Sequence, residues 1–525
     1  CSSDLAEVKI VLTIVIQVVV FAVYLLFMLL IGFGFYNTNN TLNDYFLGGR
    51  GLNKWVAAMS AQASDMSGWL LLGLPGTAFL VFGGTTEALW TAIGLLIGTY
   101  LNWLFVAKRL RKQTEVSNNS ITIPVYFENR FEDKTHILRV ASSLFIMFFF
   151  LIYTASQFTA GAKLLEATLG VPYVVGLIIG GVIITGYTFT GGFKAVAWTD
   201  LIQGIIMFFA IIAIPIIIVC QMGGFEGTAI EFKGLEAAKN EVFSWLPKSA
   251  GGTINILLLV SSLGWGLGYF GQPHILSRFM AIRSPKEVRP ARIIAMIWVI
   301  LTLGAAVLIG VLGKVYVENG MVAQNYVEMV NGDSEKIFMV LIQTIFGGSK
   351  NIFMIILSGV FLTAILAAIM STADSQLLVT ASTFGEDLYR LFSKKKPSSD
   401  SLVRISRYAV VVIALIAIFI SLNRNSSVFE LVSMAWGGFG AAFGPCILFS
   451  LYYRKTTAPA AIAGVLTGGI VDIIWYFLKG GIFNVYELVP AFIISCLVIF
   501  VVSQFTKCPE SVSKQYDEAQ TIEIN

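Results

Sequence analysis

The chain has 525 residues, of which 56% are hydrophobic and only 13% are charged, and its net charge is +4. Soluble domains carry about a quarter charged residues, and a soluble core could not bury so many all-apolar helices, so the composition indicates an integral membrane protein. The small positive charge does not indicate nucleic-acid binding, because the basic residues lie in short loops between apolar stretches.

Apolar stretches long enough to cross a bilayer recur along the whole chain, since about 20 helical residues span its hydrocarbon core. We therefore expect an all-α polytopic membrane protein with about thirteen transmembrane helices. With the N-terminus outside, most Lys and Arg residues fall on the inner side, as in cytoplasmic loops, so we expect the N-terminus outside and the C-terminus inside. The expected spans are 8–36, 53–79, 85–107, 135–169, 172–190, 195–222, 251–280, 287–318, 350–384, 402–423, 427–452, 457–478 and 484–506.

Two of these spans, 53–79 and 251–280, contain helix-breaking residues in mid-membrane. The first holds Gly68, Gly73 and Pro75, and the second reads GWGLGYFGQP over 264–273. In a helix interior glycine costs about 1 kcal/mol and proline about 3 kcal/mol relative to alanine. Because unpaired backbone cannot face lipid, such breaks must face protein or a water-filled cavity. The alternative interpretation is that the glycines only allow close helix packing.

Each broken span begins a set of five, and because five is odd the second set is inverted relative to the first. Paired broken helices in inverted repeats predict a substrate and ion site near the bilayer midplane. The polar tail from Lys507 is expected to be mobile. The predicted organisation is 1–52, an extra helix and inner loop; 53–222, the first repeat; 223–250, an outer loop; 251–452, the second repeat; and 453–525, two helices and a polar tail.

Acids inside apolar spans are costly and are candidates for function. Asp65 lies beside the first break, and Asp200 and Asp374 could converge with it on the inner half of the membrane. Asp472 lies outside both repeats, and we interpret it as structural. Two acids near one another in low dielectric require a counter-ion, which makes Asp200 and Asp374 candidates for a cation site.

The span 350–384 carries a polar stripe, because Ala368, Ser371, Thr372 and Ser375 share one helix face. Two hydroxyls and a carbonyl there, with carbonyls freed at the break over 63–66, would give about five oxygen ligands, which suit a hard cation such as sodium. The alternative is that the hydroxyls bond carbonyls of their own helix.

Several segments of the chain resemble the solute:sodium symporter family, and within it the proline-transporting branch. The likeness runs from about residue 40 to residue 505. The segments are 44–50 (DYFLGGR), 63–69 (ASDMSGW), 131–134 (FEDK), 198–200 (WTD), 264–274 (GWGLGYFGQPH) and 437–445 (GGFGAAFGP).

This resemblance implies a leucine-transporter-type fold with inverted five-helix repeats. It assigns a sodium site to Ala63, Met66, Ala368, Ser371 and Thr372. It assigns a proline pocket to Ser67, Gly68, Trp69, Tyr153, Trp265, Tyr269 and Pro273. Asp200, Asp374 and Ser375 resemble positions that form a second sodium site in some relatives, and with Asp65 they are the candidates for a second ion or coupling site.

The expected function is sodium-coupled uptake of L-proline by alternating access, with another small amino acid or a carboxylate such as pantothenate as the alternative substrate. Sodium is the expected coupling ion, and we expect no cofactor and no nucleic acid. The chain has no GxxxxGK[ST] motif, so we expect no nucleotide and no ATP-driven transport. With two histidines and no HExxH motif, we expect no enzyme; His274 is interpreted as a polar group at a helix end. We expect a monomer in the lipid bilayer of a bacterial plasma membrane.

Overall fold

The structure is a computed structural model of the whole chain, and it describes residues 2–35, 46–80, 84–190, 192–234, 245–248, 253–395 and 397–521. Much of the loop expected at 223–250 and part of the segment 44–50 lie outside these residues. The described residues form helices and turns, with two isolated β-bridges as the extended pairings.

The first part of the chain forms the helices up to residue 234. They are α1 (Ser2–Phe35), η2 (Gly48–Arg50), α3 (Lys54–Asp65), η3 (Trp69–Gly73), α4 (Leu74–Phe79), α5 (Gly84–Leu101), η4 (Asn102–Val106), α6 (Ala107–Val116), α7 (Ile123–Phe131), α8 (Ile137–Leu169), α9 (Tyr173–Thr190), α10 (Phe193–Gln221) and α11 (Gly224–Gly234).

The remaining helices follow from residue 256. They are α13 (Ile256–Gly264), η5 (Trp265–Gly271), α14 (Pro273–Ala281), η6 (Pro285–Glu287), α15 (Val288–Glu318), α16 (Gln324–Gly332), η7 (Ser334–Lys336), α17 (Ile337–Ile342), η8 (Gln343–Gly347), α18 (Ile352–Ser382), η9 (Thr383–Tyr389), α19 (Arg390–Phe392), α20 (Ser399–Ile420), α21 (Val428–Tyr452), α22 (Ala458–Phe477), η10 (Gly481–Asn484), α23 (Leu488–Phe505) and α24 (Glu510–Thr521).

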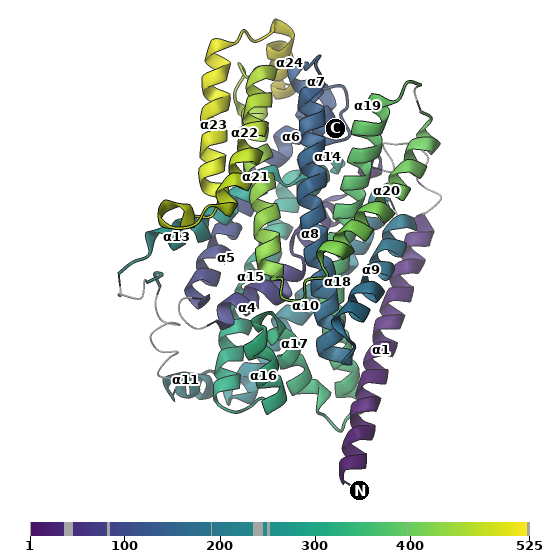
Figure 1. Cartoon of the computed structure of the whole chain (residues 1–525), viewed down its shortest axis with the longest axis vertical. Coiled ribbons are helices and arrows are strands. Elements are labelled where there is room, and N and C mark those ends of the chain that lie inside the picture. Colours follow the sequence, from purple (N-terminus) through teal and green to yellow (C-terminus); the bar gives the residue numbers. More distant parts are fainter. Residues whose placement is uncertain are drawn as a thin grey trace.

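Ten helices in the described residues are long and apolar enough to cross a membrane. Three shorter apolar helices, Trp69–Phe79, Tyr173–Phe189 and Ile256–Gly271, lie within the three remaining expected spans. The all-helical membrane architecture is therefore confirmed for the part of the chain that the structure describes. The long helices run side by side along the longest axis of the molecule (Figure 1).

Both predicted helix breaks are present. The α-helix α3 ends at Asp65, Met66 turns the chain with φ −79° and ψ 74°, and a π-helical turn starts at Trp69. The second broken helix ends its α-helical part at Gly264, continues as a 3-10 helix and restarts at Pro273 after the extended Gln272. Close packing also needs these glycines, since a Cβ on Gly266 would lie 2.3 Å from the carbonyl oxygen of Gly94 in α5. The glycines therefore both interrupt the helices and allow close helix packing.

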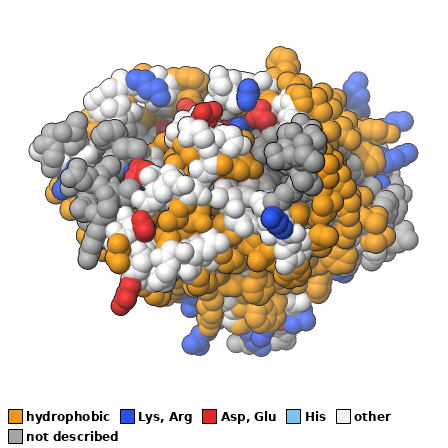
Figure 2. Space-filling model, turned by 90° about the horizontal axis from the view of Figure 1, so that it is seen from below, with side chains coloured by type: hydrophobic (Ala, Val, Ile, Leu, Met, Phe, Trp, Pro, Cys, Tyr) orange, Lys and Arg blue, Asp and Glu red, His pale blue; other side chains and the backbone are white. Residues whose placement is uncertain are grey.

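The molecule has two ends, which we name by their surface helices. The α16 face is formed by residues 223–234 and 319–336 and lies at the end that holds the N-terminus, whereas the α24 face is formed by residues 108–136 and 510–521 and lies at the end that holds the C-terminus (Figure 1). Seen from the α16 face, hydrophobic side chains dominate the right side and the lower part of the molecule, whereas acidic side chains lie toward the left and the top (Figure 2). The described ends of the chain are thus on opposite faces.

The expectation of a mobile tail is wrong for residues 510–521. They form α24, which packs on α6 and α7 with Val512 and Ala519 buried. Arg130 donates a hydrogen bond to the carbonyl oxygen of Val512 at 3.0 Å, and Arg454 pairs with Asp517 at 2.7 Å. The buried positions lie seven residues apart on one face of an otherwise polar helix, so docking offsets the entropy of ordering the tail.

Candidate ion and substrate site

Oxygen atoms of α3 and α18 meet where α3 breaks. The Ser371 hydroxyl donates to the carbonyl oxygen of Ala63 at 2.8 Å and to that of Ala368 at 3.1 Å, and the Thr372 hydroxyl lies 3.4 Å from the same Ala63 oxygen. Met66 is the residue at which the helix ends, and its N–H bonds the Gln62 carbonyl oxygen. All five residues predicted for sodium are buried, and four of them share these contacts. Carbonyl and hydroxyl oxygens are the donors that a hard cation prefers.

Asp65 is bonded to the aromatic residues of the predicted proline pocket. Tyr269 donates its hydroxyl to the Asp65 carboxylate at 2.7 Å. The Asp65 carbonyl oxygen accepts from the Trp69 indole at 3.0 Å and from the Tyr153 hydroxyl at 3.3 Å. Among the described residues no hydrogen bond joins Asp65 to Asp200 or Asp374, so its contacts fit the pocket better than a second ion site.

Four aromatic side chains from α8 and the two breaks are buried around this point: Trp69, Tyr153, Trp265 and Tyr269. The rings of Trp69 and Trp265 have centroids 6.4 Å apart. Trp265 is stacked against Phe429 and Tyr486, at 4.9 and 5.2 Å between centroids. This packing fixes the ring positions in an apolar surround.

Pro273 directly precedes His274, whose ring centroid lies 6.1 Å from that of Tyr153. It begins α14 and, together with Thr122, Ser277 and Thr383, lines a cavity of about 20 Å³ on the side of the α24 face.

Sequence reasoning missed Gln157, which contacts the first break. The Gly68 N–H donates to Gln157 Oε1 at 3.1 Å, and Gln157 Nε2 donates to the Ser67 hydroxyl at 3.2 Å. Gln157 is fully buried in the middle of α8. An uncharged polar side chain in an apolar stretch was the available signal, but it is weaker than the signal of an acid.

Arg278 in α14 was also missed, and it joins Asp200 and Ser375. Its guanidinium lies 3.1 Å from the Asp200 carboxylate and 2.6 Å from the Ser375 hydroxyl. Ser60 completes the cluster, because it donates to Asp200 at 2.6 Å and accepts from Arg278 at 3.0 Å. Both oxygens of Asp374 are buried and accept no hydrogen bond from the described residues. The counter-ion of Asp200 is thus a residue of the chain.

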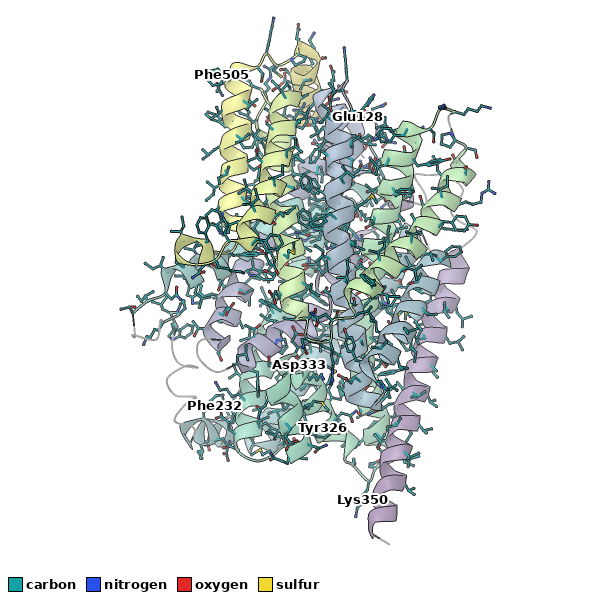
Figure 3. All side chains as sticks on the ribbon, in the orientation of Figure 1. Glu128, Phe232, Tyr326, Asp333, Lys350 and Phe505 are labelled. Carbon is teal, nitrogen blue, oxygen red and sulfur yellow. The ribbon has the colours of Figure 1, made fainter. Side chains whose placement is uncertain are left out.

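Toward the α16 face, an ion-pair cluster joins α8, η7 and α21. Glu335 accepts from Lys163 at 2.6 Å and from the backbone N–H groups of Val428 and Phe429 at 3.0 and 2.9 Å. Asp333 also pairs with Lys163, at 3.0 Å. Figure 3 places Asp333 between the helix bundle and α16. The carboxylate of Glu335 therefore ties α8 to the N-terminus of α21, where the helix dipole favours a negative charge.

Toward the α24 face, arginines donate mainly to carbonyl oxygens. Arg50 bonds the carbonyl oxygens of Met280 and Ser120 at 2.7 and 2.8 Å, and also Thr114 and Asn119. Burial, followed by the nearby Arg111, lowers the pKa of Arg50 to about 10, so it stays charged at neutral pH. Backbone bonds between Leu52 and residues 281–283 support the same closure. The four buried aromatic side chains thus lie between two clusters of hydrogen bonds and ion pairs.

A buried set of hydroxyl and carbonyl oxygens beside two interrupted helices defines a secondary transporter of ions and small solutes. The chain belongs to the family described as "Sodium:solute symporter family", whose sequence profile matches residues 45–468.

Curated relatives resemble the chain over nearly its whole length. The sodium/proline symporter of Salmonella typhimurium is 44% identical to it, and the match covers 95% of this chain and 95% of the relative. The sodium/proline symporter of Escherichia coli is also 44% identical, and the match covers 96% of each chain. The osmoregulated proline transporter OpuE of Bacillus subtilis is 42% identical over 94% of this chain and 95% of the relative.

Solved structures share the fold at low sequence identity. A Na⁺-coupled sialic acid symporter in a substrate-bound outward-open state matches with a TM-score of 0.74 and 20% identity, over 94% of this chain and 98% of the other. MhsT in complex with L-phenylalanine matches with a TM-score of 0.51 and 15% identity, over 86% and 97%. These likenesses concern the fold alone.

Proposed function

We propose that the chain carries L-proline into the cell together with sodium. The observation that carries this proposal is the 44% identity, over 95% of the chain, to a protein named as a sodium/proline symporter. The buried aromatic set beside a broken helix agrees with it, because proline has a carboxylate, an ammonium and a compact apolar ring. Transport of this kind involves no covalent chemistry, and the protein is a transporter of the bacterial plasma membrane with many spans.

The proline pocket is proposed to hold the two charged groups and the ring separately. Backbone N–H groups at the start of the half-helix, beginning with Gly68, bind the carboxylate, as helix N-termini bind anions. Trp69, Tyr153, Trp265 and Tyr269 surround the ring, and their faces attract the ammonium with about 0.5–2 kcal/mol. Ser67 lies at the same break, and Pro273 contacts the solute on its way toward the α24 face.

Sodium is proposed to bind between Ala63, Met66, Ala368, Ser371 and Thr372. A cation there takes the place of the hydroxyl hydrogens that now point at the Ala63 carbonyl oxygen. It would join α3 to α18 at Ala63, two residues before Asp65. Sodium binding would therefore hold in place the helix break on which the proline contacts depend. This is a direct route for coupling ion binding to solute binding.

One sodium ion per proline is proposed. The Arg278 guanidinium lies where a second cation between Asp200 and Ser375 would have to bind, and it already neutralises Asp200. Asp374 precedes Ser375 in α18, and its carboxylate accepts no hydrogen bond from the described residues. We assign Asp200, Asp374, Ser375 and Arg278 to a coupling site that changes its internal pairing when the neighbouring sodium leaves.

The proposed topology has thirteen spans, with the α16 face outside and the α24 face in the cytoplasm. It follows from the basic residues of α6, α7 and the following loops, which lie on the α24 face. The repeats are proposed at 53–222 and 251–452, flanked by 1–52, 223–250 and 453–525. The unit that transports is proposed to be a monomer.

Uptake of labelled proline in a strain lacking proline carriers tests the substrate. We expect sodium-dependent uptake, competition by close ring analogues of proline, and little competition by glucose or pantothenate. Strong competition by pantothenate, with none by unlabelled proline, would overturn the substrate assignment and leave the fold intact.

A further inference from the structure

The side-chain amide of Gln157 is hydrogen-bonded to the residues that follow the broken end of α3. Its oxygen accepts from the Gly68 N–H at 3.1 Å, and its nitrogen donates to the Ser67 and Ser156 hydroxyls at 3.2 and 2.9 Å. A glutamine amide offers two acceptor positions and two donors, so both donors are used here. The residue is fully buried in α8, where a polar side chain needs such partners.

The Gly68 N–H, which donates to Gln157, is also a group to which a carboxylate would bind. The α-helical part of α3 ends at Asp65 and the next helical turn starts at Trp69, so the Gly68 N–H lies at the start of a half-helix. Free N–H groups at such a start bind anions. A Cβ on Gly68 would lie 3.3 Å from Gln157 Oε1 and 2.9 Å from the Ala160 methyl group, so the approach is close.

An amide oxygen and a carboxylate oxygen are both planar acceptors of similar size. We propose that Gln157 is a stand-in for the proline carboxylate, holding the Gly68 N–H whenever the carrier is unloaded and releasing it when proline binds. This inference rests on the proposed function and adds a residue that controls the return of the unloaded carrier. The amide nitrogen of Gln157 stays hydrogen-bonded to the Ser67 and Ser156 hydroxyls while its oxygen releases the Gly68 N–H.

The consequence concerns one half of the transport cycle. Net uptake requires the unloaded carrier to close around the pocket and return, whereas exchange of internal for external proline uses only loaded carriers. Without Gln157 the buried Gly68 N–H has no acceptor after proline leaves, and an unpaired buried donor makes closure unfavourable. Exchange is spared, because the proline carboxylate itself pairs that N–H.

The test compares Gln157→Leu with wild type in proteoliposomes. We expect sodium-driven net uptake of labelled proline to fall about tenfold, the size of effect expected for one unpaired buried donor, while exchange at equal sodium falls less than about twofold. Equilibrium binding of proline should be unchanged or tighter, since a competitor for the Gly68 N–H is gone. Thr168→Val in the same helix is the control, because the Thr168 hydroxyl bonds the Leu164 carbonyl oxygen and should leave all three measurements unchanged.

Two further variants keep the proposal testable if Gln157→Leu does not fold. Gln157→Asn keeps an amide that is too short to reach, and should show the same split between net uptake and exchange. Gln157→Glu puts a permanent carboxylate on the Gly68 N–H, and should weaken proline binding at least about tenfold.

Parallel loss of net uptake, exchange and binding in Gln157→Asn and Gln157→Leu would overturn the proposal, because it would make Gln157 a ligand of bound proline. Unchanged net uptake in both variants would overturn it as well. A wild-type protein that neither binds nor carries proline would contradict the proposed function instead, and that result is obtained before any variant is measured.

Discussion

The two ends of the pocket are closed by different chemistry. Toward the α16 face, Glu335 and Asp333 pair with Lys163, and Lys336 pairs with Glu166 at 2.9 Å, so opposite charges meet across helices. Toward the α24 face, Arg50 and Arg130 donate to carbonyl oxygens of other segments, and Arg139 donates to the Glu386 carbonyl oxygen besides its longer ion pair with Asp387 at 3.6 Å. A buried charge that loses its partner is costly, whereas one lost bond among several to carbonyl oxygens is not. Removal of one charged residue should therefore disrupt the contacts toward the α16 face, whereas removal of one arginine should only weaken those toward the α24 face.

The largest effect is expected for Glu335→Ala. The change removes the acid that pairs with Lys163 and caps α21, and breaking a buried pair costs about 3–5 kcal/mol. We expect the maximal rate of proline uptake to fall at least about tenfold, measured in vesicles at saturating sodium. Asp333→Asn is the matched control, because Asp333 is less buried than Glu335, and its effect should be clearly smaller. Wild-type uptake by Glu335→Ala would show that the charge pair is not the closure.

A smaller effect is expected for Arg50→Ala at the other end. The variant loses four hydrogen bonds, but the backbone bonds between Leu52 and residues 281–283 remain. Net bonds of this kind contribute about 0.5–1.5 kcal/mol each, and neighbours compensate in part, so we expect uptake to fall about fivefold. A cysteine at Ser382, which lines the cavity near Pro273, should react faster with a thiol reagent in the variant. An equally slow reaction would contradict the role of Arg50 in closing this end.

A still smaller effect on uptake is expected for Val512→Asp in α24. Val512 is fully buried where α24 packs on α6 and α7, and a charge there should undock the helix. We expect the apparent Tm of the purified protein to fall by about 1–2 °C, the shift that roughly 1–2 kcal/mol produces in a chain of 525 residues, and uptake to fall about twofold. Gln520→Asp on the exposed side of the same helix is the control. An unchanged Tm for Val512→Asp would mean that docking of α24 adds nothing.

The smallest effect is expected for the exposed pair of Arg454 and Asp517. The Arg454 hydrogen bond holds the pKa of Asp517 below its usual range. A lowered pKa stabilises docking at pH values above the unfolded pKa, and that contribution is lost as pH falls through the folded pKa. At neutral pH Asp517→Asn should change uptake less than about twofold, because exposed pairs are weak and screened by salt. A severe loss at neutral pH would assign this pair a function beyond docking.

Local signals in the sequence predicted the parts of the site that lie within one helix. Glycines and prolines predicted both breaks, because their cost inside a helix is a local property. Helical spacing predicted that Ala368, Ser371 and Thr372 share a face, and in the structure the Ser371 and Thr372 hydroxyls both lie within hydrogen-bond distance of the Ala63 carbonyl oxygen. The roles of these residues in binding sodium and proline stay predictions.

Partners that come from distant helices could not be predicted in the same way. Arg278 pairs with Asp200 across 78 residues of sequence, and Gln157 reaches Gly68 across 89, so neither contact follows from periodicity. The tail was misjudged because its composition is polar, although Val512 and Ala519 form an apolar face that finds a partner only after folding.

Simultaneous recording of proline uptake and current in proteoliposomes tests the central claim most directly. The account predicts that an inward sodium gradient drives accumulation of proline, that about one positive charge enters with each proline, and that potassium cannot replace sodium. Equal accumulation without sodium would contradict sodium coupling, and about two charges per proline would contradict the assignment of Arg278 as the fixed cation beside Asp200.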